Sequence, residues 1–236
     1  MNDTTETDST MLRIWQQNLN TSRYAQLSLL NQPDCKTWDI LAIQEPYTNP
    51  LNNTTANCHY NVIYPTTRFT NSEKRVRAVT LISATINRNA WSQLDFPSPD
   101  VVVTQFKGPY GLCTIINIYN DGNSDQTLQL LTCFMTDNKH IIKPTDNDHI
   151  LLLGDFNQHH PLWEEECNSH LLTNSYLSTA EPLLLLLAKH GLQQALPKNI
   201  PTLQSLVTKN WTHPDNVFCT ENTCQSFINC YTEPHL

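Results

Sequence analysis

A carboxylate and a carboxamide stand two residues apart, directly after a short run of apolar residues. Residues 150–153 are all apolar, and Gly154, Asp155 and Asn157 follow them. Such a run is typical of a strand buried on both faces, so the two polar side chains should lie at the end of a sheet strand. Residues two apart in a strand point the same way, so the acid and the amide can address one ligand together. Taken alone, the pair could equally be a turn that caps a core strand.

Further segments place polar side chains at the ends of predicted strands. These are Asn18 after 12–17, Glu45 after 38–44, Tyr119 at the end of 112–119, and Asp215 ahead of the short strand 216–220. Carboxylates without a set of thiolates or imidazoles suit a hard cation, so Mg²⁺ is the expected cofactor, with Mn²⁺ as the alternative. A second acid could activate water, while an amide and a phenol could bind phosphoryl oxygens. This combination indicates a phosphodiesterase.

The elements that must position these residues are mostly strands. Besides those named above, β-branched and apolar runs predict strands at 61–64, 76–86 and 101–106 and a last strand at 226–231. Two sheets packed face to face, with helices outside, are the expected arrangement of this α/β chain.

Three segments have helical spacing of their apolar residues. The first covers 24–30, capped by Thr21 or Ser22, and the second covers 124–138. The third covers 178–191, with Pro182 in the first turn and Gly191 at the stop. Because this helix carries five consecutive leucines, we expect it to be buried nearly all round.

Composition limits the class of protein. The 236 residues contain no linker-like stretch, so we expect one domain over 11–236 behind an acidic, disordered tail at 1–10. The absence of a long apolar run and of a signal peptide predicts no membrane partner and an intracellular protein, nuclear or cytoplasmic and not secreted. The eight cysteines lack Cys-x-x-Cys pairs, and the wide spacing of Cys219, Cys224 and Cys230 argues against zinc. We expect reduced thiols.

The net charge of −8 does not favour binding to nucleic acid, because neutralisation of phosphates dominates non-specific DNA affinity. Four basic residues nevertheless lie within ten positions: Arg68, Lys74, Arg75 and Arg77. They predict a local basic face that contacts the DNA backbone; a solvated loop is the alternative.

Five motifs together resemble the endonuclease/exonuclease/phosphatase superfamily: Gln-Asn-Leu at 17–19, Gln-Glu-Pro at 44–46, Asn-Ile-Tyr at 117–119, Gly-Asp-Phe-Asn at 154–157 and Asp-Asn-Val-Phe at 215–218. More closely, segments 42–47, 154–163 and 210–219 resemble the apurinic-type endonuclease domain of fungal non-LTR retrotransposons. The resemblance implies a four-layer α/β sandwich that nicks target DNA to prime reverse transcription, with a reverse transcriptase module in the parent element.

The resemblance also implies roles for individual residues. Glu45 would ligate Mg²⁺, with Asn18 near the metal-bound water or the phosphate. Asp155 would orient or deprotonate the attacking water, and Asn157 would hold the phosphate. Tyr119 would help to stabilise the transition state.

Other positions match the family less directly. Asp215 matches an acid that supports the catalytic histidine or the metal site, and Asn120 and Asn123 bracket the position of another family asparagine. His159 and His160 either pack and hydrogen-bond locally or touch DNA.

The family ends in a Ser/Thr-Asp-His motif on a last core strand, whereas this sequence stops at residue 236 without one, and His235 is not a credible substitute. The resemblance therefore implies a DNA endonuclease that is weak or inactive and of reduced stability. Two alternatives stay open: a weak or inactive relic that keeps the fold and DNA affinity but turns over poorly, and a phosphoesterase for small molecules or lipids.

Overall fold

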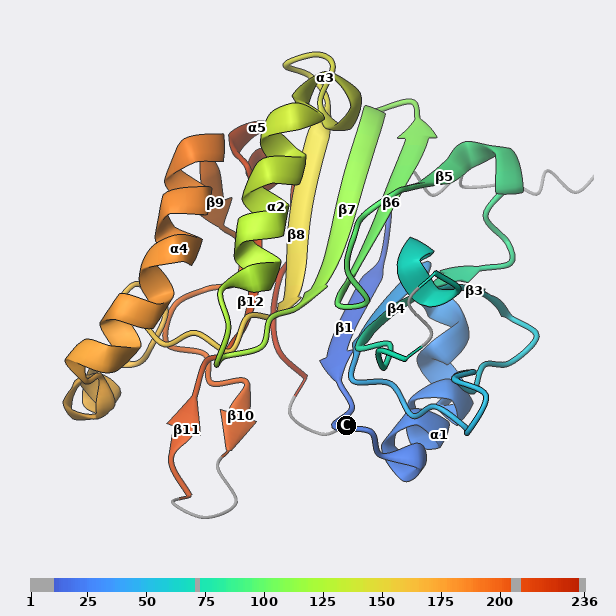
Figure 1. Cartoon of the computed structure of the whole chain (residues 1–236). Coiled ribbons are helices and arrows are strands. Elements are labelled where there is room, and N and C mark those ends of the chain that lie inside the picture. Colours follow the sequence, from blue (N-terminus) through green and yellow to red (C-terminus); the bar gives the residue numbers. More distant parts are fainter. Residues whose placement is uncertain (1–10, 71–72, 205–208, 234–236) are drawn as a thin grey trace, which may run out of the picture.

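The computed structural model describes residues 11–70, 73–204 and 209–233, so the predicted tail at 1–10 and His235 lie outside the described ranges. Two mixed β-sheets pack face to face in the part described (Figure 1). The smaller sheet has the order β1-β2-β4-β3 and consists of β1 (Ile14–Asn18), β2 (Ile40–Gln44), β4 (Ala78–Ser83) and β3 (Tyr60–Ile63). Only β1 and β2 run parallel among its described pairs.

The larger sheet has the order β5-β6-β7-β8-β12-β9. Its strands are β5 (Trp91–Leu94), β6 (Val101–Gly108), β7 (Gly111–Tyr119), β8 (His149–Asp155), β12 (Asp215–Thr220) and β9 (Leu192–Gln194). Strands β7 and β8 are parallel neighbours, and β12 lies antiparallel to β8. A short hairpin of β10 (Leu203–Gln204) and β11 (Trp211–Thr212) projects from the body next to β12 (Figure 1).

Helices cover the outer faces of both sheets. Helix α1 (Arg23–Asn31) packs on the smaller sheet, while α2 (Gln126–Asp137) and α4 (Asn174–His190) pack on the larger one (Figure 1). The shorter helical segments are α3 (Lys139–Ile142), α5 (Glu221–Ser226) and the 3-10 turns Pro33–Thr37, Thr66–Arg68, Arg88–Ala90 and Glu166–Leu171. The predicted four-layer sandwich of two sheets with helices outside is confirmed.

Strand periodicity explains how the layers are held together. In β8, Ile150 and Leu152 point to the helices α2 and α4, while Leu151 and Leu153 point between the sheets. The strand is therefore buried on both faces, as its unbroken apolar run predicts. The strands predicted at 12–17, 38–44, 61–64, 76–86, 101–106 and 112–119 all form, as do the first two helices. Ser22 caps α1 by accepting a hydrogen bond from Ala25 N.

Two predictions about the third helix are wrong. Helix α4 begins at Asn174, after the N-cap Thr173, so Pro182 lies inside the helix rather than in its first turn. The helix is also not buried all round, because Leu185 is 63% exposed while Leu183, Leu186 and Leu187 face the core. The helix is amphipathic, but five consecutive leucines place the same residue type on every face. The sequence therefore has no periodicity that would show which face is buried.

The strand predicted at 226–231 does not form in the described residues. Helix α5 ends at Ser226, and the Phe227 backbone N–H donates to Cys224 O to close its last turn. Ile228 is 77% exposed, so this apolar residue does not contribute to a sheet.

Two expectations about composition can be compared with the described residues. No helix within the described ranges has both the length and the apolar content needed to cross a membrane. All eight cysteines lie in those ranges, and each is a free thiol, as predicted.

Candidate active site

The polar residues predicted at strand ends converge at one edge of the two sheets. Tyr119, Asp155 and Asp215 are register partners on the adjacent strands β7, β8 and β12. Their side chains share the face that packs against the smaller sheet, where Asn18 ends β1 and Glu45 follows β2. Residues far apart in the sequence therefore form one cluster between the sheets.

Asp155 is the centre of this cluster. Its side chain accepts a hydrogen bond from Asn18 Nδ2 across the sheet interface, at 2.7 Å, and another from the Asn157 backbone N–H, at 2.9 Å. The residue is only 5% exposed. Burial, and then the proximity of Asp215, raise the pKa of Asp155 to about 7, although the bonds from Asn18 and Asn157 act in the opposite direction. A carboxylate with a pKa near neutrality can accept and release a proton at physiological pH.

Asn157 is held in a left-handed backbone conformation. Its φ of 49° turns the chain directly after β8, and its Nδ2 donates to Asn120 O at 2.9 Å. A short polar side chain tolerates this conformation better than most. One amide hydrogen is used in this bond, so the second is free to donate to a ligand.

Glu45 and Tyr119 form the second half of the site. Glu45 also has a positive φ, of 43°, and its backbone N–H donates to Arg77 O at 2.8 Å. The Tyr119 phenol lies near enough to the Glu45 carboxylate to be affected by its charge. Burial, followed by the charges of Glu45 and Asp155, raises the pKa of Tyr119 to about 12. The phenol is therefore protonated and can donate a hydrogen bond.

A chain of three amides, of which Gln44 and Asn117 are fully buried, reaches Asp215 from the middle of the sandwich. Gln16 Nε2 donates to Asp215 Oδ1 at 2.9 Å and to Gln44 Oε1 at 2.6 Å. Gln44 Nε2 donates in turn to Asn117 Oδ1 at 2.6 Å, and Asn117 Nδ2 donates to Val79 O at 2.8 Å. Burial raises the pKa of Asp215, while its bond from Gln16 acts against that rise. These amides orient the acid without adding a charge.

No role was predicted from sequence for Gln16, Gln44 or Asn117. A signal was present, because Gln16 lies two residues before Asn18 and therefore shares its face of the strand. Asn117 likewise lies two residues before Tyr119. Of the two asparagines that bracket the family position, Asn120 is fully buried beside the site and donates to Phe156 O at 2.8 Å.

Hard-cation chemistry fits the side chains at this edge. Among the described residues, no three of His, Cys, Asp and Glu are arranged to hold a metal by themselves. The Glu45 carboxylate and the Asn18 side-chain oxygen are nevertheless suited to Mg²⁺, which commonly takes one or two protein carboxylates and completes its shell with water and substrate phosphate. A cation would also offset the acidic charge that raises the pKa of Asp155.

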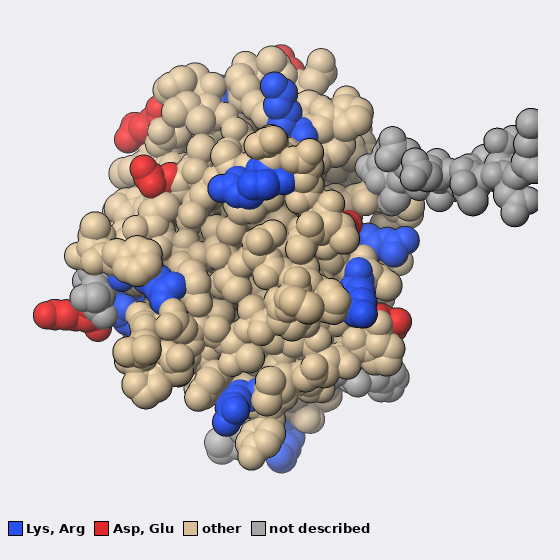
Figure 2. Space-filling model, turned by 90° about the vertical axis from the view of Figure 1, so that its right-hand side faces the viewer, with Lys and Arg blue, Asp and Glu red and all other residues tan. Residues whose placement is uncertain are grey.

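The predicted DNA-contacting residues lie in different surroundings. Arg68 stacks 3.6 Å over the Tyr64 ring, and Lys74 and Arg75 are exposed at a pocket of about 300 Å³. Arg77 pairs with Asp100 and Asp121. Figure 2 shows separate basic side chains on the β3 and β5 side of the molecule, with few acidic ones, mostly toward the margins. The excess negative charge of the chain is therefore distributed unevenly over the surface, with few acidic side chains on this face.

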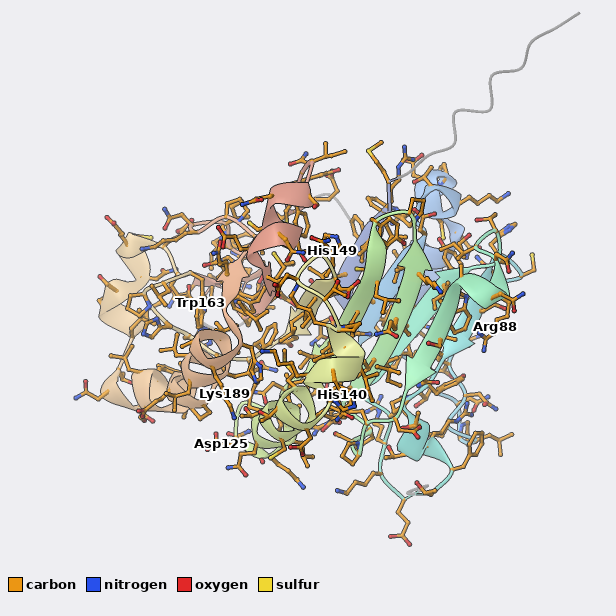
Figure 3. All side chains as sticks on the ribbon, turned by 90° about the horizontal axis from the view of Figure 1, so that it is seen from above. Arg88, Asp125, His140, His149, Trp163 and Lys189 are labelled. Carbon is orange, nitrogen blue, oxygen red and sulfur yellow. The ribbon has the colours of Figure 1, made fainter. Side chains whose placement is uncertain are left out.

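The two histidines beside the site hydrogen-bond locally. His159 Nδ1 lies 2.7 Å from Glu164 Oε1, and His160 Nδ1 accepts from Leu162 N at 3.2 Å. Glu164 also accepts from His213 N at 3.1 Å, so it joins the loop after Asn157 to the segment before Asp215. Trp163, which is 1% exposed, lies among the side chains under α4 (Figure 3). This loop is held from several sides.

The chain is similar in sequence and in structure to known endonucleases. A family model described as Endonuclease-reverse transcriptase matches residues 113–236, whereas no curated protein sequence matches the chain. The endonuclease domain of TRAS1, a telomere-specific non-LTR retrotransposon, has a similar structure, with a TM-score of 0.67 and 17% identity over 91% of this chain and 88% of that one.

Other solved structures share the fold. The AP endonuclease LMAP from Leishmania major gives a TM-score of 0.68 with 11% identity, over 95% of this chain and 83% of that one. A mannosyl-6-phosphatase from Bacteroides thetaiotaomicron gives 0.53 with 12% identity, over 89% and 86%. At such low identities the likeness establishes the fold, which hosts both nucleases and phosphatases.

Proposed function

Because the chain belongs to the Endonuclease-reverse transcriptase family, we propose that it is a DNA endonuclease that hydrolyses a phosphodiester bond with the help of Mg²⁺ or Mn²⁺. The observation that carries the proposal is the Asp155 carboxylate, buried at the sheet edge and held between Asn18 and Asn157. A buried base flanked by amide donors suits attack of water on a phosphate.

Each half of the cluster has its own task in this reaction. Asp155 accepts the proton of the attacking water, and its burial, together with the nearby Asp215, raises its pKa and keeps the carboxylate basic. Asn157 donates its free amide hydrogen to a phosphate oxygen. Tyr119 donates its hydroxyl hydrogen as charge builds on the phosphoryl group, since its raised pKa keeps the phenol protonated.

Glu45 and Asn18 would hold the divalent cation. When bound, the cation supplies charge stabilisation for the phosphate oxygens and the leaving group. Glu45 is well suited to this role because its backbone N–H donates to Arg77 O and its carboxylate lies near Tyr119.

A nicking assay on supercoiled plasmid tests the proposal. We expect conversion to open circles in Mg²⁺ and none in EDTA, with loss of several orders of magnitude in rate for Glu45→Gln and Asp155→Asn. The matched controls Glu181→Gln and Asp137→Asn change exposed acids on α4 and α2 and should nick like the unmodified chain. Full nicking by either site variant would exclude this assignment of the site.

A DNA-binding measurement and a panel of small phosphoesters separate the alternatives. DNA binding without any nicking would favour a relic that keeps only affinity. Hydrolysis of small phosphoesters, lost in Glu45→Gln while plasmid stays intact, would favour a small-molecule phosphoesterase. Under our proposal DNA is the partner, a reverse transcriptase module is its neighbour in the parent element, and the protein acts inside the cell, in the nucleus or cytoplasm.

A further inference from the structure

Arg77 was predicted to neutralise a DNA phosphate, but its guanidinium is already engaged within the protein. Nε and Nη2 donate to the two carboxylate oxygens of Asp100, each at 2.7 Å, and Nη1 donates to Asp121 Oδ2 at 2.9 Å. The Asp100 side chain is 8% exposed, so a paired cation is needed there. A bidentate bond of this kind also fixes the plane of the guanidinium.

This guanidinium lies against the site rather than in solvent. Its central carbon is 4.8 Å from the centroid of the Tyr119 ring, within the range of a cation–π contact. Asp100, its partner, accepts the Tyr119 backbone N–H through its own carbonyl oxygen at 2.8 Å. Arg77 therefore acts on both the ring and, through Asp100, the backbone of Tyr119.

The backbone of Arg77 reaches the other half of the site. Its carbonyl oxygen accepts the Glu45 N–H at 2.8 Å, at the position where Glu45 adopts a positive φ. Because Arg77 precedes β4 in the smaller sheet and Asp100 precedes β6 in the larger one, the ion pair joins the two sheets beside the site.

Building on the proposed function, we propose that Arg77 is a positioning residue that aligns Tyr119 with Glu45 and makes no contact with DNA phosphate. Its neighbours Lys74 and Arg75 are exposed and form no ion pair with another described residue, and they carry the contacts with the DNA backbone. Binding and turnover then depend on different members of one basic segment.

The test compares Arg77→Gln and Arg77→Lys with Arg88→Gln. Arg88 is a matched control because its guanidinium also stacks on an aromatic ring, with its central carbon 3.9 Å from the centroid of the Trp91 ring. Arg88 lies on the side of the molecule opposite Trp163 (Figure 3). We expect both Arg77 variants to lose on the order of 10–100-fold in kcat for nicking, because small misplacements of catalytic groups are costly. The Kd for a DNA duplex, measured without turnover in EDTA, and its salt dependence should not change.

A second readout does not depend on activity. In protein labelled with 3-fluorotyrosine, the ¹⁹F resonance absent from Tyr119→Phe belongs to Tyr119. It should shift in Arg77→Gln and Arg77→Lys and stay in place in Arg88→Gln. Should Arg77→Gln fail to fold, by thermal midpoint, Arg77→Lys keeps the charge that Asp100 needs and carries the comparison.

Some results would overturn the inference: an unshifted Tyr119 resonance, an unchanged kcat, or a salt slope reduced by about one unit, which marks a lost phosphate contact. If the unmodified chain does not nick DNA at all, the proposed function fails. The resonance would then still decide whether Arg77 positions Tyr119.

Discussion

At the residue scale, the site gathers acidic charge where little water can reach it. Asp155 is almost fully buried, with Asp215 on the neighbouring strand and Glu45 across the interface. Glu45 and Asn157 also adopt positive φ values. Unfavourable charge proximity and rare backbone conformations persist where the surrounding structure enforces them, and they are frequent at functional sites.

This charge makes stability depend on pH in a definite direction. The pKa of Asp155 in the folded state, about 7, is above its ordinary value of 3.8. The contribution of this group to stability is therefore present below pH 4 and is lost as the pH rises through 7. In EDTA, the free energy of unfolding of the unmodified chain relative to Asp155→Asn should fall by on the order of 2 kcal/mol between pH 5 and pH 8.

Urea unfolding at the two pH values measures this difference. Asp137→Asn serves as the control, because Asp137 is exposed on α2 and its replacement should leave the pH dependence as it is. A difference between the unmodified chain and Asp155→Asn that stays constant from pH 5 to pH 8 would contradict the raised pKa.

At the element scale, the position of Asp155 depends on how closely β8 approaches β7. Gly154 has a φ of +144°, and a Cβ built there would lie 1.9 Å from Ile118 O. Glycine is therefore required by contact and by conformation at the residue before the base. Gly191, at the end of α4, has a φ of +61° but open space around a Cβ.

We expect alanine at these two positions to lower the free energy of unfolding by different amounts. Gly191→Ala should lower the free energy of unfolding by about 1 kcal/mol, the penalty of a left-handed alanine. Gly154→Ala should cost more than about 3 kcal/mol and abolish nicking, because the methyl group must push β7 away from β8. Chemical denaturation of both variants measures the costs, and equal values would show that the strands adapt without strain.

At the scale of the whole molecule, the sheets are joined by more than apolar packing. The Gln16, Gln44 and Asn117 amides cross the interface between them, where Asn117 is completely buried. Such a chain is stabilising only when all members are satisfied, since an unpaired buried amide costs about 1–3 kcal/mol.

Asn117→Leu removes the last amide of this chain. The Gln44 amide hydrogen and the Val79 carbonyl oxygen would lose their partner, so we expect a loss of about 2–4 kcal/mol in the free energy of unfolding. Asn61→Leu, at an exposed position of β3, should change it by no more than about 0.5 kcal/mol. Guanidinium unfolding compares the two, and a cost for Asn117→Leu no larger than the control would exclude a structural role for the chain.

The uneven surface charge predicts how DNA binding responds to salt. Lys74 and Arg75 are exposed, although the chain as a whole has a net charge of −8. Each DNA phosphate that they neutralise releases counterions and should contribute about 0.9 to the slope of log K against log salt. The double variant Lys74→Ser with Arg75→Ser should therefore flatten the slope by about two units in fluorescence anisotropy. An unchanged slope would show that this segment is a solvated loop that makes no contact with DNA phosphates.

The strands, the two-sheet architecture and the superfamily resemblance were predictable from the order and type of the residues. The alternating and unbroken apolar runs were sufficient to predict the strands and the two-sheet sandwich, because strand periodicity determines which face is buried. The superfamily resemblance, drawn from five short motifs, is confirmed by the family match and the structural neighbours. Asn18, Glu45, Tyr119, Asp155 and Asp215 were all expected at strand ends, and the structure brings them to one edge.

Tertiary structure alone decided how these residues interact. Gln16 meets Asp215 across 199 positions of sequence, and no local pattern encodes such a contact. The basic segment at 68–77 looked uniform, yet the fold pairs Arg77 with Asp100 and leaves Lys74 and Arg75 exposed. In the same way, the leucine run and the apolar residues near 228 could not reveal which side chains face water. Burial and pairing depend on neighbours that only the folded chain brings together.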